Sequence, residues 1–146
     1  MKLVLAADHG GFELKNQLAA ALTAAGHEVT DLGTNEPASV DYPDYAHRAA
    51  KAILDGTHER GILVCGSGVG MSLAANRHPG IRAVVCSDTY TARLSREHND
   101  ANILALGQRV VGPGLAKDIV DAWLGAKFEG GRHSKRVEKI ELPKYK

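Results

Sequence analysis

The chain has 146 residues, of which 44% are apolar and 24% are charged, and this composition is typical of one globular domain with a substantial core. The net charge of +1 argues against a nucleic-acid-binding protein that depends on bulk positive charge. No apolar stretch is long enough to span a bilayer, and the first residues follow a strand pattern rather than that of a signal peptide. Two widely spaced cysteines do not form a disulfide framework, so we expect a single domain over residues 1–146 in a reducing cytoplasm.

Strand-like and helix-like patterns alternate along the whole chain. The apolar spacing predicts strands at residues 2–7, 28–32, 61–65, 81–86 and 102–106. It predicts helices from residue 12 to Gly26, at 44–54, at 69–76, from Asp88 or Thr89 to about Arg96, after Gly114 and, at the end of the chain, at 132–142. Five such strands indicate a three-layer α/β/α Rossmann-like fold with a five-stranded parallel sheet and a C-terminal helix.

Ligands of such a sheet bind beyond the carboxyl ends of the strands. Polar residues and glycines gather directly after the predicted strands, in Asp8-His9-Gly10-Gly11, Gly33-Thr34, the segment 65–70, Ser87-Asp88 and Gly107-Gln108-Arg109. We therefore expect the functional site at this edge of the sheet.

The segment from Ile62 to Gly70 is the most informative part of the chain. An apolar run that suits a buried parallel strand ends in Cys65, and Gly66, Gly68 and Gly70 follow at alternate positions. Glycines allow backbone N–H groups to approach an anion, and the next helix adds the positive end of its dipole, so the thiolate form of Cys65 should be favoured. For the glycines alone, a tight turn remains an equally good interpretation.

The sequence does not favour a nucleotide-binding loop at this segment or a functional role for the second cysteine. The segment lacks the G-x-G-x-x-G spacing of a dinucleotide site and the lysine of a P-loop. Cys86 ends an apolar run and is expected to pack as a small hydrophobic side chain.

Asp8, His9 and His98 each allow two interpretations. Asp8 could cap the next helix, or it could lie with His9 beside Cys65, because neighbouring parallel strands bring their ends together. We favour the second arrangement. His98 follows a predicted helix and is either a surface residue at the negative end of the helix dipole or a proton donor.

Two arginines in the terminal basic segment share one face of the predicted helix. Arg132 and Arg136 are four residues apart, so they form either a solvated basic face or a clamp for a phosphate group. No H-x-x-x-H or comparable cluster indicates a metal site, and we expect no metal.

Taken together, these segments resemble the family of B-type ribose-5-phosphate isomerases, which includes galactose-6-phosphate isomerase subunits. The resemblance covers nearly the whole length and rests on motifs in the expected order: Asp8-His9-Gly10-Gly11, Asp41-Tyr42-Pro43, Cys65 to Gly70, Ile81-Arg82-Ala83, Leu94 to Asn102, Gly107-Gln108-Arg109-Val110 and Glu129-Gly130-Gly131-Arg132-His133.

The resemblance implies an aldose–ketose isomerase without a metal or organic cofactor, acting on ribose 5-phosphate and ribulose 5-phosphate. It implies that Cys65 is the base, that the loop of Gly66, Ser67, Gly68, Val69 and Gly70 stabilises the enediolate, and that His98 with Asp8 opens the sugar ring. It also implies substrate contacts, with phosphate at His9, Arg132 and Arg136, and with other parts of the substrate at Asn99 and Arg109.

The same resemblance implies a homodimer, or a dimer of such dimers, with active sites shared between subunits. It implies a sugar phosphate as the small-molecule partner and neither nucleic acid nor membrane. One departure is Ser67, where relatives commonly carry threonine, and the missing methyl group leaves more room for the substrate.

Two alternatives stay open at this point. The same chemistry could act on allose, galactose or erythrulose phosphate, since the residues that set the depth of the pocket cannot be read from the pattern. The chain could also be a non-catalytic sugar-phosphate-binding module, because a fold does not determine a function.

Overall fold

The structure is a computed structural model, and it describes residues 1–141. The strands are β1 (Lys2–Ala7), β2 (Glu28–Asp31), β3 (Arg60–Cys65), β4 (Ala83–Val85) and β5 (Ile103–Gly107). The helices are α1 (Phe12–Ala24), α2 (Tyr42–Leu54), α3 (Val69–Ala75), α4 (Thr89–Glu97), α5 (Pro113–Gly125) and α6 (Arg132–Glu138).

All five strands form one parallel sheet in the order β2-β1-β3-β5-β4. The three central strands are apolar on both faces and almost entirely buried, as expected for strands covered by helices on two sides. The register pairs Ala7 with Val64 and Cys65 with Gly107, so the carboxyl ends of β1, β3 and β5 meet at one edge.

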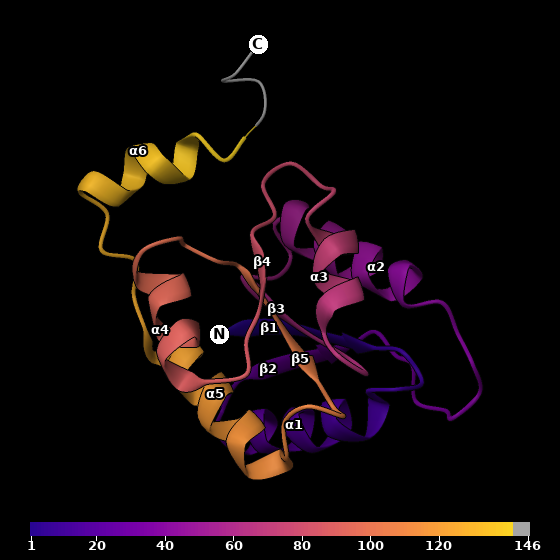
Figure 1. Ribbon diagram of the computed structural model, residues 1–146. Helices are drawn as coiled ribbons and strands as arrows, with labels where there is room; N and C mark the ends of the chain where they lie inside the picture. Colours follow the sequence, from indigo (N-terminus) through magenta and orange to yellow (C-terminus); the bar gives the residue numbers. More distant parts are fainter. Residues whose placement is uncertain (142–146) are drawn as a thin grey trace.

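Helices cover both faces of the sheet, and Figure 1 shows α2 and α3 on one side with α1, α4 and α5 on the other. The side chains of Leu14, Leu18 and Leu22 repeat every four residues on α1 and pack with Trp123 of α5 against the sheet face that α1, α4 and α5 cover. Three alanines of α2, with Met71 of α3, pack against the opposite face of the sheet. The three-layer fold predicted from the sequence is confirmed.

Several element boundaries differ from the prediction. β4 is shorter than 81–86, because the Ile81 N–H bonds to the His78 carbonyl in a turn and the Arg82 N–H bonds to the Asn102 side chain instead of a neighbouring strand. α2 begins two residues early, with Pro43 in its first turn, where a missing N–H costs nothing.

The terminal helix α6 ends at Glu138, so the predicted helix over 132–142 is too long, and Leu142 lies outside the described residues. In Figure 1, α6 stands apart from the sheet and the five helices that cover it. Within residues 1–141, no helix combines the length and the apolar character needed to cross a membrane.

Candidate active site

A cavity of about 420 Å³ opens at the carboxyl edge of the sheet, where β1, β3 and β5 end. Six residues that the sequence analysis selected line it, and they lie at or after the ends of these three strands: Asp8, Cys65, Gly66, Ser67, Gly70 and Arg109. Tyr42 and Val110 also line the cavity. The strand-end rule therefore located this cavity correctly.

Cys65 lies in the wall of this cavity and is only 5% exposed. The backbone N–H of Gly68 donates a hydrogen bond to its Sγ atom over 3.1 Å. Such a donor stabilises negative charge on the sulfur, because a thiolate accepts hydrogen bonds more strongly than a thiol. The loop therefore directs a backbone hydrogen-bond donor at the sulfur in the cavity wall.

Gly68 can occupy its place only as glycine. Its φ angle is +81°, and a Cβ atom there would lie 2.8 Å from Val85 Cγ2 and 3.0 Å from the carbonyl carbon of Leu106. The conformation and the close approach are both required to direct this N–H at the sulfur. The turn interpretation and the functional interpretation of the glycines thus describe the same geometry.

Asp8 is not the cap of α1. Its carboxylate accepts a hydrogen bond from the Gly10 N–H over 2.8 Å, whereas the N-cap position of α1 is Gly11, without a side-chain cap. A Cβ atom at Gly11 would overlap the Val64 carbonyl oxygen, so α1 begins in direct contact with β3. Asp8 and Cys65 line the same cavity, whereas His9, which was expected beside them, does not line it.

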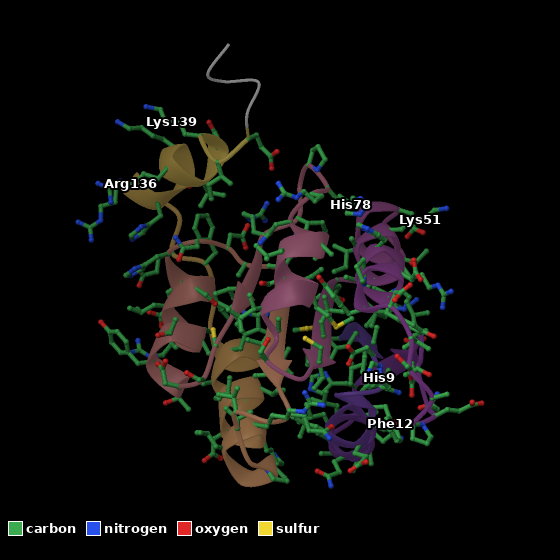
Figure 2. All side chains as sticks on the ribbon, turned by 45° about the vertical axis from the view of Figure 1, so that its right-hand side comes forward. His9, Phe12, Lys51, His78, Arg136 and Lys139 are labelled. Atoms are coloured by element: carbon green, nitrogen blue, oxygen red, sulfur yellow. The ribbon has the colours of Figure 1, made fainter. Side chains whose placement is uncertain are left out.

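His9 is held beside the cavity by the loop that leads to α2. The Val40 N–H donates to His9 Nδ1 over 3.2 Å, so this nitrogen is the acceptor and the ring proton lies on Nε2. Figure 2 shows His9 near the start of α1, on the side of this loop. His9 therefore presents an N–H donor, although it does not line the cavity itself.

A fully buried lysine anchors the same loop. Lys15 Nζ contacts both carboxylate oxygens of Asp31 at 2.6 Å and the side-chain oxygen of Asn35 at 2.7 Å. The ion pair and its hydrogen bonds satisfy the buried charge. They tie α1 to the segment that follows β2, which also carries the contact to His9.

Arg109 and Tyr42 line the cavity beside two of the loop glycines. The Arg109 N–H bonds to the Gly66 carbonyl over 3.1 Å, and a Cβ atom on Gly66 would lie 3.2 Å from the guanidinium Nη1. A Cβ atom on Gly70 would lie 2.5 Å from a ring carbon of Tyr42. Gly66 and Gly70 thus leave room for these two side chains. Tyr42 was missed as a site residue because its segment was predicted to be a polar loop, although its Asp41-Tyr42-Pro43 motif was a usable signal.

His98 and Asn99 lie outside the cavity of Cys65. His98 follows α4 and stacks on His133 of α6 with ring centroids 4.3 Å apart. Burial, and then the proximity of His98 and Arg132, lower the pKa of His133. Asn99 lines a separate cavity of about 440 Å³ together with Ser95.

A buried arginine shapes the turn that carries these two residues. Arg96 donates to Asp100 Oδ1 over 2.9 Å and to the Ala101 carbonyl, and Arg82 contacts the same carboxylate at 3.3 Å. Asp100 itself has a φ angle of +49°. The turn of His98 and Asn99 is thus fixed by charged contacts beneath it.

Arg132 and Arg136 are exposed on α6, outside the cavity of Cys65. Figure 2 shows Arg136 pointing outward, away from the body of the molecule. Val69 lines neither cavity and is 47% exposed at the start of α3. A single chain therefore brings together the part of the predicted site around Cys65, but not the part around His98 and the arginines.

Cys86 behaves as the sequence predicted. It is 3% exposed within the apolar core formed with α1, α4 and α5, and burial raises the pKa of its thiol to about 11. Its sulfur is therefore a neutral core atom, which leaves Cys65 as the cysteine at the cavity.

Comparison with known proteins gives the same family as the motifs. The family model described as Ribose/Galactose Isomerase matches residues 3–140. The chain is 57% identical over 139 residues to ribose-5-phosphate isomerase B of Escherichia coli, covering 95% of this chain and 93% of that protein. It is 47% identical over 142 residues to D-erythrulose-4-phosphate isomerase of Pectobacterium atrosepticum, covering 96% and 93% of the two chains.

Solved structures agree with these sequence matches. The ribose-5-phosphate isomerase B of Clostridium thermocellum superposes with a TM-score of 0.97 at 56% identity, covering 99% of this chain and 97% of the other. That of Thermotoga maritima superposes with a TM-score of 0.94 at 50% identity, over 95% and 96% of the chains. The chain therefore belongs to the ribose/galactose isomerase family.

Proposed function

We propose that this protein is a ribose-5-phosphate isomerase of the B type, with Cys65 as the catalytic base. The observation that carries the proposal is the hydrogen bond from the Gly68 N–H to Cys65 Sγ at a cavity that Asp8, Ser67 and Arg109 also line. Similarity to the ribose-5-phosphate isomerases B of the relatives above supports the choice of ribose 5-phosphate.

The proposed reaction moves one proton between neighbouring carbons. The thiolate of Cys65 takes the proton from C2 of the open-chain aldose, and the electron pair of that C–H bond forms the C1–C2 double bond of an enediolate. The carbonyl electrons move to O1, and return of the proton to C1 with a proton transfer between the oxygens gives the ketose. No net oxidation or co-reactant is needed.

Stabilisation of the enediolate supplies much of the rate, because the proton is acidic only when the negative charge reaches oxygen. The loop from Gly66 to Gly70 offers backbone N–H groups and the Ser67 hydroxyl beside Cys65. Arg109 adds positive charge over Gly66. No step of this reaction requires a metal or an organic cofactor from the protein.

We further propose a homodimer in which one subunit completes the site of the other. His98 and Asn99 would supply ring opening and substrate contacts, and Arg132 and Arg136 would hold the phosphate, but these residues lie outside the Cys65 cavity of their own chain. The separate position of α6 and the exposed Leu73 of α3, 57% accessible, are consistent with contact to a second copy.

Replacement of Cys65 by Ser tests the assignment of the base. We expect loss of isomerisation of ribose 5-phosphate with an unchanged circular dichroism spectrum, because a serine hydroxyl is far less acidic than a thiol. The matched control is Cys86→Ala, which removes the other thiol and should keep its turnover. Retention of most activity in Cys65→Ser contradicts the proposal.

Mixing two inactive variants tests the shared site. If His98 of one subunit acts at the Cys65 of the other, mixed dimers of Cys65→Ser and His98→Asn contain one intact site. Random exchange then restores about a quarter of the wild-type rate, since about half of the dimers are mixed and each has one of two sites. A mixture as inactive as its parents shows that both residues act within one chain.

A second candidate substrate is erythrulose 4-phosphate, which the relative from Pectobacterium atrosepticum favours. Turnover on a panel of ribose 5-phosphate and erythrulose, allose and galactose phosphates distinguishes these candidates. Preference for the four-carbon substrate over ribose 5-phosphate by kcat/KM would replace the first proposal while leaving the base unchanged.

A further inference from the structure

Three side chains with metal-ligating atoms converge between the end of α4 and the start of α6. His98, Glu129 and His133 each offer one ligand atom, and these atoms lie within 4.8 Å of one another. His98 is separated from the other two by some thirty positions of sequence, so no spacing of ligands along the chain indicates the cluster. The fold alone brings it together.

The separations around Glu129 suit a tetrahedral ion. Its Oε1 atom lies 3.6 Å from His98 Nε2 and 3.5 Å from His133 Nε2, longer than ordinary N–H···O hydrogen bonds of about 2.7–3.2 Å. Bonds of about 2.0–2.2 Å to Zn²⁺ place tetrahedral ligand atoms about 3.3–3.6 Å apart. The carboxylate oxygen is thus already separated from each imidazole nitrogen by the distance expected between two ligands of one ion.

The backbone holds the cluster in place while its side chains can still adjust. The Glu129 N–H bonds to the Glu97 carbonyl over 2.9 Å, next to His98, and His133 is 7% exposed. The two rings are stacked within 10° of parallel, so one of them must tilt for both Nε2 atoms to face one ion. The His98 side chain is 35% exposed and the Glu129 side chain 52%, which leaves room for this movement.

The donor set indicates which ion the cluster would bind, and the local charge indicates how tightly it would bind. Two imidazoles and one carboxylate, with a fourth position open to water, form a donor set that proteins use for Zn²⁺. The guanidinium groups of Arg132 and Arg136 lie close enough to act on His133 and oppose a cation. The site is therefore expected to bind reversibly and more weakly than a closed structural zinc site.

We propose that His98, Glu129 and His133 form a Zn²⁺ site, and that an ion bound there inhibits the isomerase by occupying the imidazole of His98. The inhibition, but not the binding, rests on the proposed function of His98 in ring opening. An imidazole whose Nε2 coordinates a metal cannot exchange a proton there.

Binding is tested in the Cys65→Ser variant, because zinc also binds thiolates. Isothermal titration with ZnCl₂ should show one ion per chain, and Co²⁺ should give the visible absorption of tetrahedral coordination. Adding Glu129→Gln should weaken binding by at least about tenfold, since even partners behind the ligands contribute 10–100-fold. The matched control is Glu97→Gln, whose carboxylate pairs with Arg93 and not with the cluster, and which should bind as before.

Inhibition is tested with Cys65 intact, by comparing each variant with and without Zn²⁺ against its own rate in EDTA. Wild type and Glu97→Gln should be inhibited at the concentrations that fill the site, and Glu129→Gln should need at least about tenfold more zinc. Zinc binding that Cys65→Ser abolishes, or that Glu129→Gln leaves unchanged, overturns the site. Binding without inhibition overturns its inhibitory role. If the metal-free wild type does not turn over ribose 5-phosphate, the proposed function is refuted. The zinc site is then still tested by the binding measurements, which do not depend on turnover.

Discussion

Replacement of Gly68 by Ala separates backbone strain from the direct contribution of this residue to the site. Gly56 provides a matched reference, because its φ angle of +82° equals that of Gly68 within a degree, while a Cβ atom there meets nothing within 4 Å. Gly56→Ala should therefore cost about 1–2 kcal/mol of unfolding free energy, the cost of a left-handed conformation alone.

Gly68→Ala carries the same strain and an additional overlap. Its Cβ atom would lie 2.8 Å from Val85 Cγ2, which can rotate, but also 3.0 Å and 3.2 Å from the backbone carbon and nitrogen of Leu106, which cannot. Overpacking of this kind costs about 1–3 kcal/mol more. The sum of about 2–5 kcal/mol leaves the variant folded if the wild type has an ordinary stability of roughly 5–15 kcal/mol.

The kcat of Gly68→Ala should fall far more than partial unfolding of the variant can explain. A shift of the loop moves the Gly68 N–H away from Cys65 Sγ and displaces the donors expected to face the enediolate. Loss of one such donor lowers kcat by about 100–1000-fold. Urea denaturation gives the free energies, and kcat is measured at a temperature where both variants are folded.

Two results would refute this reasoning. Equal destabilisation of Gly68→Ala and Gly56→Ala would show that the backbone of Leu106 does not restrict the loop. A kcat of Gly68→Ala near that of Gly56→Ala would show that the hydrogen bond to the sulfur has no part in the reaction.

Three other predictions concern the buried lysine, the core cysteine and the exposed arginines. Lys15→Met should cost roughly 3 kcal/mol in urea denaturation, the low end for one partner of a buried ion pair, because Asp31 is one-third exposed; an unchanged midpoint contradicts this. The pKa of Cys86 is raised from 9.0 to about 11. The stabilisation of the folded state by its buried neutral thiol is therefore complete below pH 9 and is lost as the pH rises towards 11. Between pH 8 and pH 10 the wild type should lose roughly 1 kcal/mol more than Cys86→Ala, and parallel curves would contradict the shift. Arg132→Ala with Arg136→Ala should raise KM at least about tenfold with a smaller effect on kcat, and an unchanged KM argues against a phosphate clamp.

The sheet and its cavity could be predicted because they follow from local patterns and a general rule. Apolar runs such as Ile62–Val64 mark buried strands, and the ends of parallel strands must share one edge. That rule was sufficient to predict from the sequence that Asp8 and Cys65 lie at the same site. Boundaries were less accurate where side chains replace backbone partners, as Asn102 does for the Arg82 N–H.

The surroundings of His98 could not be predicted for a different reason. Its contacts to Glu129 and His133 join segments that no periodicity connects, because β5 and α5 lie between them in the sequence. The same holds for Tyr42, whose place on Gly70 depends on how α2 packs against α3. Such long-range contacts carry no signal in the spacing of residues.

The contact between Gly11 and the Val64 carbonyl fixes the start of α1 against β3, next to the cavity residues Asp8 and Cys65. The segments that carry Asp8 and Cys65 cannot be displaced separately, so changes there would disturb the proposed base before they altered the choice of sugar. Tyr42 and Val110 form an exposed rim of the cavity, at 40% and 60% exposed, so their side chains can be exchanged at little cost to packing. Engineering of this scaffold toward longer or shorter sugars should therefore begin at that rim.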